Sequence, residues 1–491
     1  MFTEVAKSAP FEGAPEINTP SIIGAKTGRT MNYRLPITGE RPIYVTVIGL
    51  PDGLNLKNEP YMICGRLGEG VYDVVITAEN RLGKAVKALT VEVGDNAVPR
   101  SPLLGWTSWN AYQNIIDQDK IYMNAKVIAE SGLADYGYAY VNIDSGWQGE
   151  YGGKYGGIMA NEYFPDMHKL VSDIHALGLK AGIYSSPMML NYGSTPMLQR
   201  KYIGTTSGEV DDAIPGYTQA GKVHHEREAA RQFGDYGFDY LKYDWSPARM
   251  YHLRPMADAL LTETEREFAL SVTCLADKTE AEKLMSVGSS VRNNIDSYPR
   301  WDVVTQMIES SDGWLEYVKP GHFFDCDMLA TGEIQAVHGR DIDEITFRVT
   351  RNADGRLIYS PDEVVFEYTM RAILPSPIQL SCDLSKMTAF EFDVYTNSEV
   401  LAINQDSLCA PAVLEECRKD GDSYVRVYRK PLENGDSAVA IFNIGETDET
   451  VSVKVSGRVR DVWAKRDADF TGGEYKITLP PRTVKLIRTG K

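Results

Sequence analysis

Polar side chains stand two residues apart at the ends of several short apolar runs. The pairs are Asn142 and Asp144, Lys242 and Asp244, and Asp325 and Asp327. Side chains two apart on a strand point to the same side, so we expect each pair to face one way. A single aspartate at such a place is ordinarily a turn or helix cap. Several of them, at the ends of strands in one sheet, indicate a site.

Carboxylates gathered in this way either bind hard metal ions or cleave glycosides. Lys242 among them argues against a metal site, and His224, His225 and Glu226 are adjacent rather than spaced for a helical metal motif. The sequence also contains no GxSxG or Walker motif. Glycosidic cleavage needs one ionised carboxylate and one protonated acid. A lysine next to Asp244 would keep that aspartate ionised.

The composition fits a neutral substrate. The net charge of −17 and the pI near 5.0 disfavour nucleic acid as a partner, since such a surface repels polyanions. The 28 tyrosines and 7 tryptophans suit stacking on sugar rings. We therefore expect a small-molecule or glycan substrate, while the sequence does not indicate an oligomeric state. No apolar run predicts a membrane span, and no apolar leader is visible at the N-terminus.

The two ends of the chain have the pattern of β domains. Residues 1–98 contain β-branched, partly alternating runs such as 43–48 and 71–78, separated by Gly- and Asp-rich turns. This pattern predicts a β-sandwich similar to the immunoglobulin-like modules of secreted enzymes. Residues 409–491 alternate again and predict a C-terminal antiparallel β-sandwich.

The segment 103–406 alternates apolar strand-like runs with helical stretches, which predicts a parallel sheet. Its length suits a (β/α)8 TIM barrel, whose chemistry lies at the carboxyl ends of the strands. A doubly wound sheet is the alternative, but no GxGxxG follows an early strand. A long insertion at 186–222, rich in Gly, Tyr and Met, is either a lid over the substrate or a plain excursion.

An ordered series of motifs in the barrel segment resembles glycoside hydrolase family 27, the α-galactosidases and α-N-acetylgalactosaminidases. The motifs are Gly105-Trp106-Thr107-Ser108-Trp109-Asn110, Asn142-Ile143-Asp144-Ser145-Gly146-Trp147, Phe164-Pro165-Asp166-Met167, Gly182-Ile183-Tyr184-Ser185, Lys242-Tyr243-Asp244, Arg292-Asn293 with Asp296 and Trp301, Pro320-Gly321-His322, Asp327-Met328-Leu329 and Ala402-Ile403-Asn404-Gln405-Asp406.

This resemblance implies a retaining double displacement without a metal or organic cofactor. Asp244 matches the family's nucleophile and Asp296 its acid/base. The residues implied in binding the sugar are Trp109, Asp144, Ser145, Tyr184, Lys242, Cys274, Arg292 and Asp327. Asp327 would orient either Arg292 or the sugar.

The sequence departs from the family pattern at two places that bear on specificity. Ser145 stands where the family commonly has a second carboxylate, which removes an acceptor for the outer edge of the sugar. The strand-five motif Cys-Glu-Trp is replaced by Cys274-Leu275-Ala276-Asp277, so no glutamate aligns there. Another sugar at this site is therefore an open alternative.

The leading hypothesis is an exo-acting α-galactosidase that takes part in polysaccharide degradation. The alternatives are the same mechanism on an α-N-acetylgalactosaminide, a β-L-arabinopyranoside or an α-glucoside, and a carbohydrate-binding protein without turnover. A secreted or periplasmic location with the leader removed is favoured, and a cytoplasmic one stays open.

Overall fold

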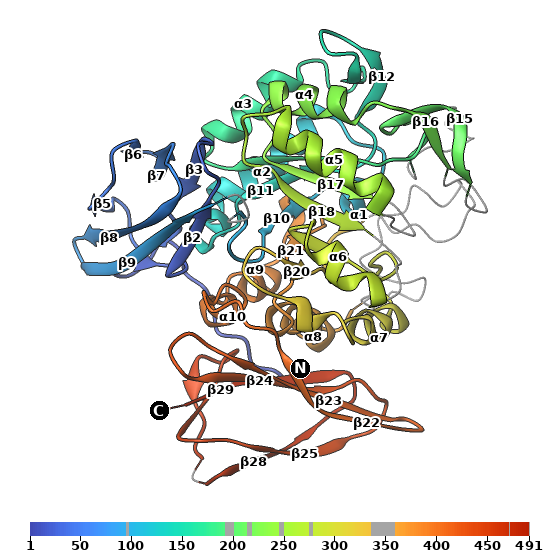
Figure 1. Ribbon diagram of the computed structural model, residues 1–491. Coiled ribbons are helices and arrows are strands. Elements are labelled where there is room, and N and C mark those ends of the chain that lie inside the picture. The colour runs from blue at the N-terminus through green and yellow to red at the C-terminus, as the bar shows by residue number, and fades with distance from the viewer. Residues whose placement is uncertain are drawn as a thin grey trace.

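The protein is described by a computed structural model (Figure 1), which covers residues 1–94, 98–191, 201–213, 219–244, 250–273, 278–334, 359–470 and 472–490. At its centre lies an eight-stranded parallel sheet in the order β20-β19-β18-β17-β14-β11-β10-β21. The two edges meet where Leu329 bridges to Leu380 in parallel. The predicted (β/α)8 barrel is thus confirmed.

The barrel strands are almost continuously buried, because helices cover them outside and side chains fill the inside. They are β10 (Leu104–Thr107), β11 (Tyr140–Ile143), β14 (Lys180–Ser185), β17 (Tyr240–Asp244), β18 (Ala269–Thr273), β19 (Ser290–Arg292), β20 (Phe323–Phe324) and β21 (Ile378–Leu380). The helices along the same segment are α1 (Trp109–Tyr112), α2 (Gln118–Glu130), α3 (Met167–Ala176), α4 (Glu226–Tyr236), α5 (Met250–Thr262), α6 (Ala281–Met285), α7 (Trp301–Ser310), α8 (Pro361–Ile373), α9 (Ala389–Tyr395) and α10 (Ser398–Asn404).

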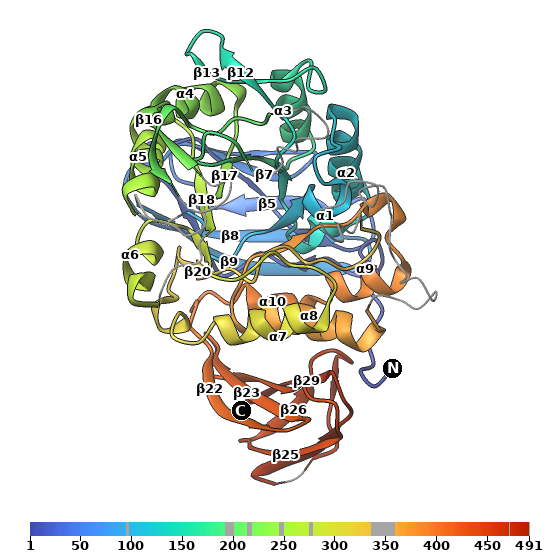
Figure 2. The same ribbon diagram turned by 90° about the vertical axis from the view of Figure 1, so that its right-hand side faces the viewer.

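Helix α8 shows how local sequence fixes an element. Ser360 and Glu363 form a reciprocal capping box, and Pro361 occupies the first turn, where it needs no hydrogen-bond partner. All residues of α8 from Glu363 to Ile373 are buried. A helix that is buried on every side belongs to the interior of the molecule, and α8 lies between the barrel and the C-terminal strands (Figure 2).

The N-terminal residues form two larger sheets around their own apolar core, and β1 (Glu16–Ile17) pairs separately with β4 (Ile37–Thr38). One sheet has the order β2-β9-β8-β5, with β2 (Ile22–Ala25), β9 (Gly83–Val93), β8 (Gly70–Asn80) and β5 (Tyr44–Ile48). The other has the order β3-β7-β6, with β3 (Met31–Arg34), β7 (Met62–Gly65) and β6 (Leu54–Lys57). We call these residues the N-terminal module; its immunoglobulin-like character stays a prediction.

The C-terminal residues form the predicted antiparallel β-sandwich. Its larger sheet contains β22 (Val413–Asp420), β23 (Ser423–Pro431), β24 (Ser437–Asn443), β29 (Thr483–Gly490), β26 (Arg458–Asp461) and β27 (Arg466–Asp467). The smaller one pairs β25 (Glu449–Lys454) with β28 (Glu474–Leu479). Valine, isoleucine and leucine side chains from both sheets make a separate core. The sandwich lies beneath α7, α8 and α10 (Figure 2).

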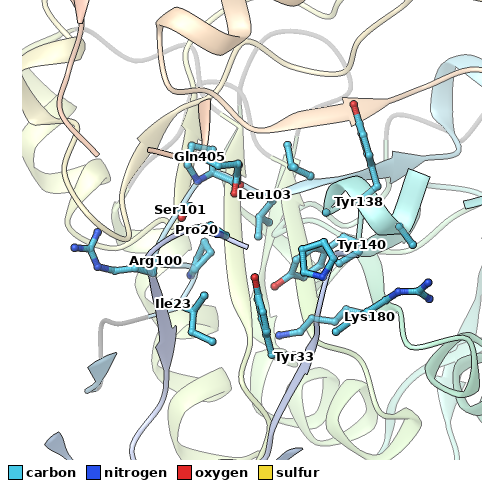
Figure 3. Close-up of a pocket in the computed structure, with 18 of the residues that line it drawn as sticks. Pro20, Ile23, Tyr33, Arg100, Ser101, Leu103, Tyr138, Tyr140, Lys180 and Gln405 are labelled. Carbon is cyan, nitrogen blue, oxygen red and sulfur yellow. The ribbon is translucent and has the colours of Figure 1, made fainter. Parts of the chain in front are cut away.

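The N-terminal module packs against the side of the barrel where its strands begin (Figure 1). Arg34 pairs with Asp135 at 3.1 Å, and Lys26 donates to the backbone oxygen of Phe268 at 2.8 Å. A hollow of about 120 Å³ lies at this junction, with Tyr33 and Lys180 on its wall (Figure 3). It is therefore at the opposite end of the barrel from the carboxyl ends of the strands.

The first residues of the chain run away from the module toward the C-terminal sandwich (Figure 1). The backbone N–H of Phe2 donates to Asp362 at 2.8 Å, and that of Ser8 donates to Asp393 at 2.8 Å. The N–H of Ala6 donates to the carbonyl of Trp463 at 2.9 Å. The N-terminal arm, residues 2–8, thus ties α8 and α9 to the sandwich.

Two hairpins extend from the barrel at the carboxyl ends of β11 and β14. They are β12 (Gln148–Gly152) with β13 (Gly157–Ala160), and β15 (Thr206–Ala213) with β16 (Gln219–His224). The second hairpin belongs to the insertion at 186–222, of which residues 192–200 and 214–218 lie outside the described part. A lid role for this insertion stays a prediction. Of the helices that the structure describes, none has the length and apolar character needed to cross a membrane.

Candidate active site

The carboxyl ends of the barrel strands surround a pocket of about 440 Å³. Its lining residues are Trp109, Asp144, Ser145, Tyr184, Lys242, Asp244, Thr273, Arg292, Asn294, Ile295, Asp296, Tyr298 and Met328. Strand β14 supplies Tyr184, β17 supplies Lys242 and Asp244, β18 supplies Thr273 and β19 supplies Arg292. The other lining residues follow the ends of β10, β11, β19 and β20. Most of the residues expected at the site are therefore brought together.

Asp244, the last residue of β17, is buried in the pocket wall. The Tyr184 hydroxyl donates to its Oδ2 at 2.9 Å. Its Oδ1 lies 3.8 Å from Arg292 Nη2 and has no hydrogen-bond partner among the described residues. Burial raises the pKa of Asp244, and the charges of Lys242 and Arg292 offset this only in part. One carboxylate oxygen is thus held and the other is left for a ligand.

Lys242 faces the same way as Asp244, but its hydrogen bond goes to a different carboxylate. Its Nζ donates to Asp144 Oδ2 at 2.8 Å and lies 5.4 Å from the centre of the Tyr184 ring. Burial opposes the charge of Lys242, but Asp144 and Asp244 outweigh it and raise its pKa. The lysine therefore stays protonated between two carboxylates.

Asp144 and Ser145 form the wall that follows β11. Asp144 Oδ1 accepts the N–H of Ser145 at 2.8 Å, and the Asp144 N–H donates to Ser108 Oγ at 3.0 Å. The Ser145 hydroxyl accepts from Gln148 Nε2 at 3.4 Å. Asp144 is thereby fixed from both sides, while Ser145 makes one long contact and presents no charge to the pocket.

Arg292, at the end of β19, distributes one guanidinium over three carboxylates. Its Nη1 donates to Asp296 at 2.6 Å and to Asp327 at 2.7 Å, in addition to the approach to Asp244. Burial opposes its charge, but Asp327 and Asp296 outweigh it and raise the pKa of Arg292. The Asp296 side chain is 46% exposed and that of Asp244 is 9% exposed. The two carboxyls thus differ sharply in contact with solvent.

Asp325 and Asp327 do not face together, contrary to the expectation from strand alternation. Strand β20 ends at Phe324, and Asp327 has a φ of 61°, so strand geometry does not apply. Asp325 is buried outside the pocket lining and accepts the Asp327 N–H at 2.8 Å. Asp327 Oδ2 accepts from Arg292 and from the N–H of Ser297 at 2.6 Å. Of the two roles considered for Asp327, this contact favours orienting the arginine.

Two further points concern the expected site residues. Trp109 lines the pocket from α1. Cys274 lies outside the described residues, as does Asp277. The pocket also includes residues that the sequence did not indicate as site residues: Thr273, Asn294, Ile295, Tyr298 and Met328. Each is within three residues of a named one or of its motif, which is the signal that could have found them.

Arg371 of α8 was missed altogether, although it contacts the backbone behind Asp327. It donates to the carbonyl oxygens of Cys326 and Met328 at 2.9 Å each and of Asp327 at 3.2 Å. An arginine within an apolar helix, four residues after Glu367, was the available signal. Within the described ranges, no cluster of three or more His, Cys, Asp or Glu side chains is placed to hold a metal ion.

Two family models match parts of this chain. The family model for α-galactosidase A matches residues 101–202, and that for the α-galactosidase C-terminal β-sandwich domain matches residues 422–489. Alpha-galactosidase 2 of Arabidopsis thaliana is 28% identical over 80% of this chain and 90% of its own length. Alpha-galactosidase A of Cellvibrio japonicus is 30% identical over 73% of this chain and 81% of its own length.

Solved structures agree on the fold. A Bacteroides fragilis protein provisionally described as an α-galactosidase aligns over 99% of this chain and 100% of its own, with 25% identity and a TM-score of 0.82. Alpha-galactosidase I of Mortierella vinacea aligns over 80% and 98%, with 24% identity and a TM-score of 0.65. A family 27 β-L-arabinopyranosidase of Geobacillus stearothermophilus aligns over 80% and 97%, with 22% identity and a TM-score of 0.65. The chain is a glycoside hydrolase and belongs to the α-galactosidase family.

Proposed function

We propose that the protein is a retaining, exo-acting α-galactosidase that removes terminal α-galactosyl groups from oligo- or polysaccharides. The observation that carries this is the pair of unlike carboxyls. Asp244 is buried with one oxygen free of hydrogen bonds, and Asp296 is half exposed on the same arginine. A nucleophile needs a carboxylate oxygen that is free to attack, and the charges of Lys242 and Arg292 favour the ionised form of Asp244 against its burial. A proton donor must reach the departing oxygen, which suits a carboxyl at the mouth of the pocket. The names of the relatives supply the substrate.

In the first step, Asp244 Oδ1 attacks the anomeric carbon and the bond from that carbon to the aglycone oxygen breaks. Asp296 gives its proton to the departing oxygen, so the leaving group departs as an alcohol. The Tyr184 hydroxyl holds the other oxygen of Asp244 at 2.9 Å and fixes the carboxylate plane. The exposure of Asp296 suits contact with a variable leaving group at the mouth of the pocket.

In the second step, water attacks the same carbon from the face that the aglycone left. Asp296, now ionised, takes a proton from the water as the bond to Asp244 breaks, which regenerates both carboxyls. The product has the configuration of the substrate. Retention requires the two carboxyls to lie about 5–5.5 Å apart, against roughly 6.5–9.5 Å in an inverting enzyme.

The remaining pocket residues would bind the sugar. Trp109 offers an aromatic face for the ring. Asp144 and Lys242, joined at 2.8 Å, offer an acceptor and a donor to the outer hydroxyls. Arg292 would reach the hydroxyls nearest the anomeric carbon.

Ser145 favours one second candidate, the same chemistry on a sugar other than galactose. A neutral hydroxyl replaces a charged acceptor there, and one charge-assisted hydrogen bond is worth about 1.5–3 kcal/mol. A family member of this fold acts on β-L-arabinopyranosides. A sugar without the group that binds this carboxylate would lose no binding energy when Ser145 stands in its place.

The deciding experiment is a panel of p-nitrophenyl glycosides: α-galactoside, α-N-acetylgalactosaminide, β-L-arabinopyranoside and α-glucoside. We expect the α-galactoside to be cleaved with the highest kcat/KM, and the first-formed sugar in NMR to keep the substrate's anomeric configuration. A preference for another glycoside would replace galactose with that sugar. Sugar binding without cleavage of any of the four would refute the enzymatic proposal.

Asp244→Asn tests the role of the nucleophile. The amide is nearly isosteric but cannot attack, so we expect kcat to fall by about 10³-fold or more. Asp302→Asn, which removes an exposed carboxylate paired with Arg300, is the matched control and should keep the wild-type kcat. Near-normal turnover by Asp244→Asn would show that another group attacks the sugar.

We propose that residues 103–406 form the catalytic unit, flanked by residues 1–98 and 409–491.

A further inference from the structure

Asp327 adopts a backbone conformation that non-glycine residues rarely take. Its φ is 61°, in the left-handed region, and it is buried. Such a conformation persists only where the surroundings hold it, and it clusters at functional sites. The residues that hold Asp327 are therefore of interest in their own right.

Both backbone polar groups of Asp327 are bound by side chains. Its N–H donates to Asp325 Oδ1 at 2.8 Å, and its carbonyl accepts from Arg371 Nε at 3.2 Å. Arg371 also binds the carbonyls of Cys326 and Met328, one on each side, at 2.9 Å. The guanidinium thus donates to the carbonyl groups of three consecutive residues and restricts the conformation of this turn.

Asp325 joins this turn to the two segments that carry the pocket's charged groups. Ser290, two residues before Arg292, donates to Asp325 Oδ2 at 3.0 Å. The Asp325 N–H donates to the carbonyl of Val291 at 2.9 Å. Asn294 donates to the Asp325 carbonyl at 3.1 Å and lies two residues before Asp296.

These contacts fix the direction in which the Asp327 carboxylate points. With its backbone held, Asp327 directs Oδ2 at Arg292 Nη1 at 2.7 Å and at the Ser297 N–H at 2.6 Å. Arg292 in turn reaches Asp296 and approaches Asp244. If Asp327 turned away, the arginine would lose its most buried partner and move toward the other two carboxylates.

We propose that Asp325 and Arg371 are positioning residues that place Arg292 through Asp327. Neither lines the described pocket, so neither touches the sugar. The proposal rests on the proposed function, in which Arg292 binds the sugar next to Asp244 and Asp296. By this proposal, Asp325 and Arg371 affect sugar binding through Arg292 and do more than stabilise the fold.

The test compares two variants of Asp325 of similar size. Asp325→Asn keeps an oxygen for the Asp327 N–H, and the Ser290 hydroxyl can turn to accept from the new amide. We expect its kcat/KM to stay within about threefold of wild type. Asp325→Leu removes both acceptors, and we expect kcat/KM to fall about 10- to 100-fold, with KM rising as Arg292 leaves its place.

A matched control separates positioning from general loss of stability. Asp239→Asn changes another buried aspartate, which lies just before β17 at the opposite end of the barrel. It should lower the unfolding midpoint without changing KM. If Asp325→Leu does not fold, Ser290→Ala takes its place, with an expected rise in KM of about three- to tenfold.

Two further readouts make the proposal independent of turnover. A crystal structure of Asp325→Leu should show Arg292 Nη1 more than about 3.5 Å from Asp327 Oδ2, and calorimetry should show weaker galactose binding. Failure of the wild type to cleave any glycoside would refute the proposed function. The Arg292–Asp327 distance in the crystal structure of Asp325→Leu would then still test the positioning role. Wild-type KM in Asp325→Leu, or equal losses in the Asn and Leu variants, would overturn the inference.

Discussion

Removal of Arg371 should show how much the buried ion pair of Arg371 and Glu367 on α8 contributes to the free energy of unfolding. Both Arg371 and Glu367 have side chains that are 0% exposed. Arg371→Met would leave the Glu367 carboxylate buried, and among the residues that the structure describes the hydroxyl of Tyr359, at 2.9 Å, would remain as its donor. It would also leave the carbonyls between Cys326 and Met328 without their donor.

The magnitude follows from these contacts. Removing one partner of a buried ion pair costs about 3–5 kcal/mol, and each carbonyl deprived of its donor costs about 1–3 kcal/mol. The two sets overlap, because the turn relaxes once the arginine is gone, so we expect a loss of about 5 kcal/mol. That is a large part of the 5–15 kcal/mol that holds a typical domain.

The double variant Arg371→Met/Glu367→Met provides the internal control. It removes the stranded charge and fills the space with apolar atoms of similar volume. We therefore expect it to be about 2 kcal/mol more stable than Arg371→Met alone, despite carrying one more substitution. Urea unfolding followed by tryptophan fluorescence, read at the first transition, measures this difference.

Additive losses would contradict this reasoning. If the double variant lost as much stability as the two single variants together, the pair would not be coupled. Galactose binding gives a second readout. Both variants that lack Arg371 should bind galactose more weakly, because the turn at Asp327 is loosened in each.

Two further predictions concern pH. Burial raises the pKa of Asp244, and Lys242→Met removes a charge that lowers it. We therefore expect the acid limb of kcat/KM to move to higher pH, and an unmoved limb would show that Lys242 does not act on the nucleophile. Burial opposes ionisation of Asp239, but the hydrogen bond from His175 and the charge of Arg266 lower its pKa to about 2. Its contribution is therefore present above the ordinary pKa and lost as pH falls toward 2, about 2 kcal/mol in all. Asp239→Asn should lack this loss when unfolding is measured at pH 5 and at pH 2.5, and a wild type without it would contradict the assignment.

Three residues expected at strand ends, Asp144, Lys242 and Asp244, line one pocket because parallel strands bring their carboxyl ends together. Arg292, which the family resemblance implied, lines the same pocket. Alternation correctly put Lys242 beside Asp244. It could not say which carboxylate the amine would reach, since that depends on neighbouring strands, and the hydrogen bond goes to Asp144.

The same reasoning failed where the strand stopped. Alternation beyond Phe324 assumed an extended backbone, whereas Asp327 is left-handed. Nothing in a run of residue types reveals such a turn when no glycine marks it. Arg371 was missed for a related reason, because its partners are backbone carbonyls about 45 residues earlier in the chain.

The N-terminal arm has a consequence for how the molecule is made. Its partners, among them Asp362, Trp463 and Val484, are 360 to 481 residues later in the chain. At about 5–20 residues per second, the ribosome reaches them roughly 20–100 s after the arm has emerged. The module and barrel can fold in turn during that interval, but the arm must wait. Its docking is therefore among the last events of folding. It joins the barrel to a sandwich whose residues had not yet been synthesised when the arm emerged.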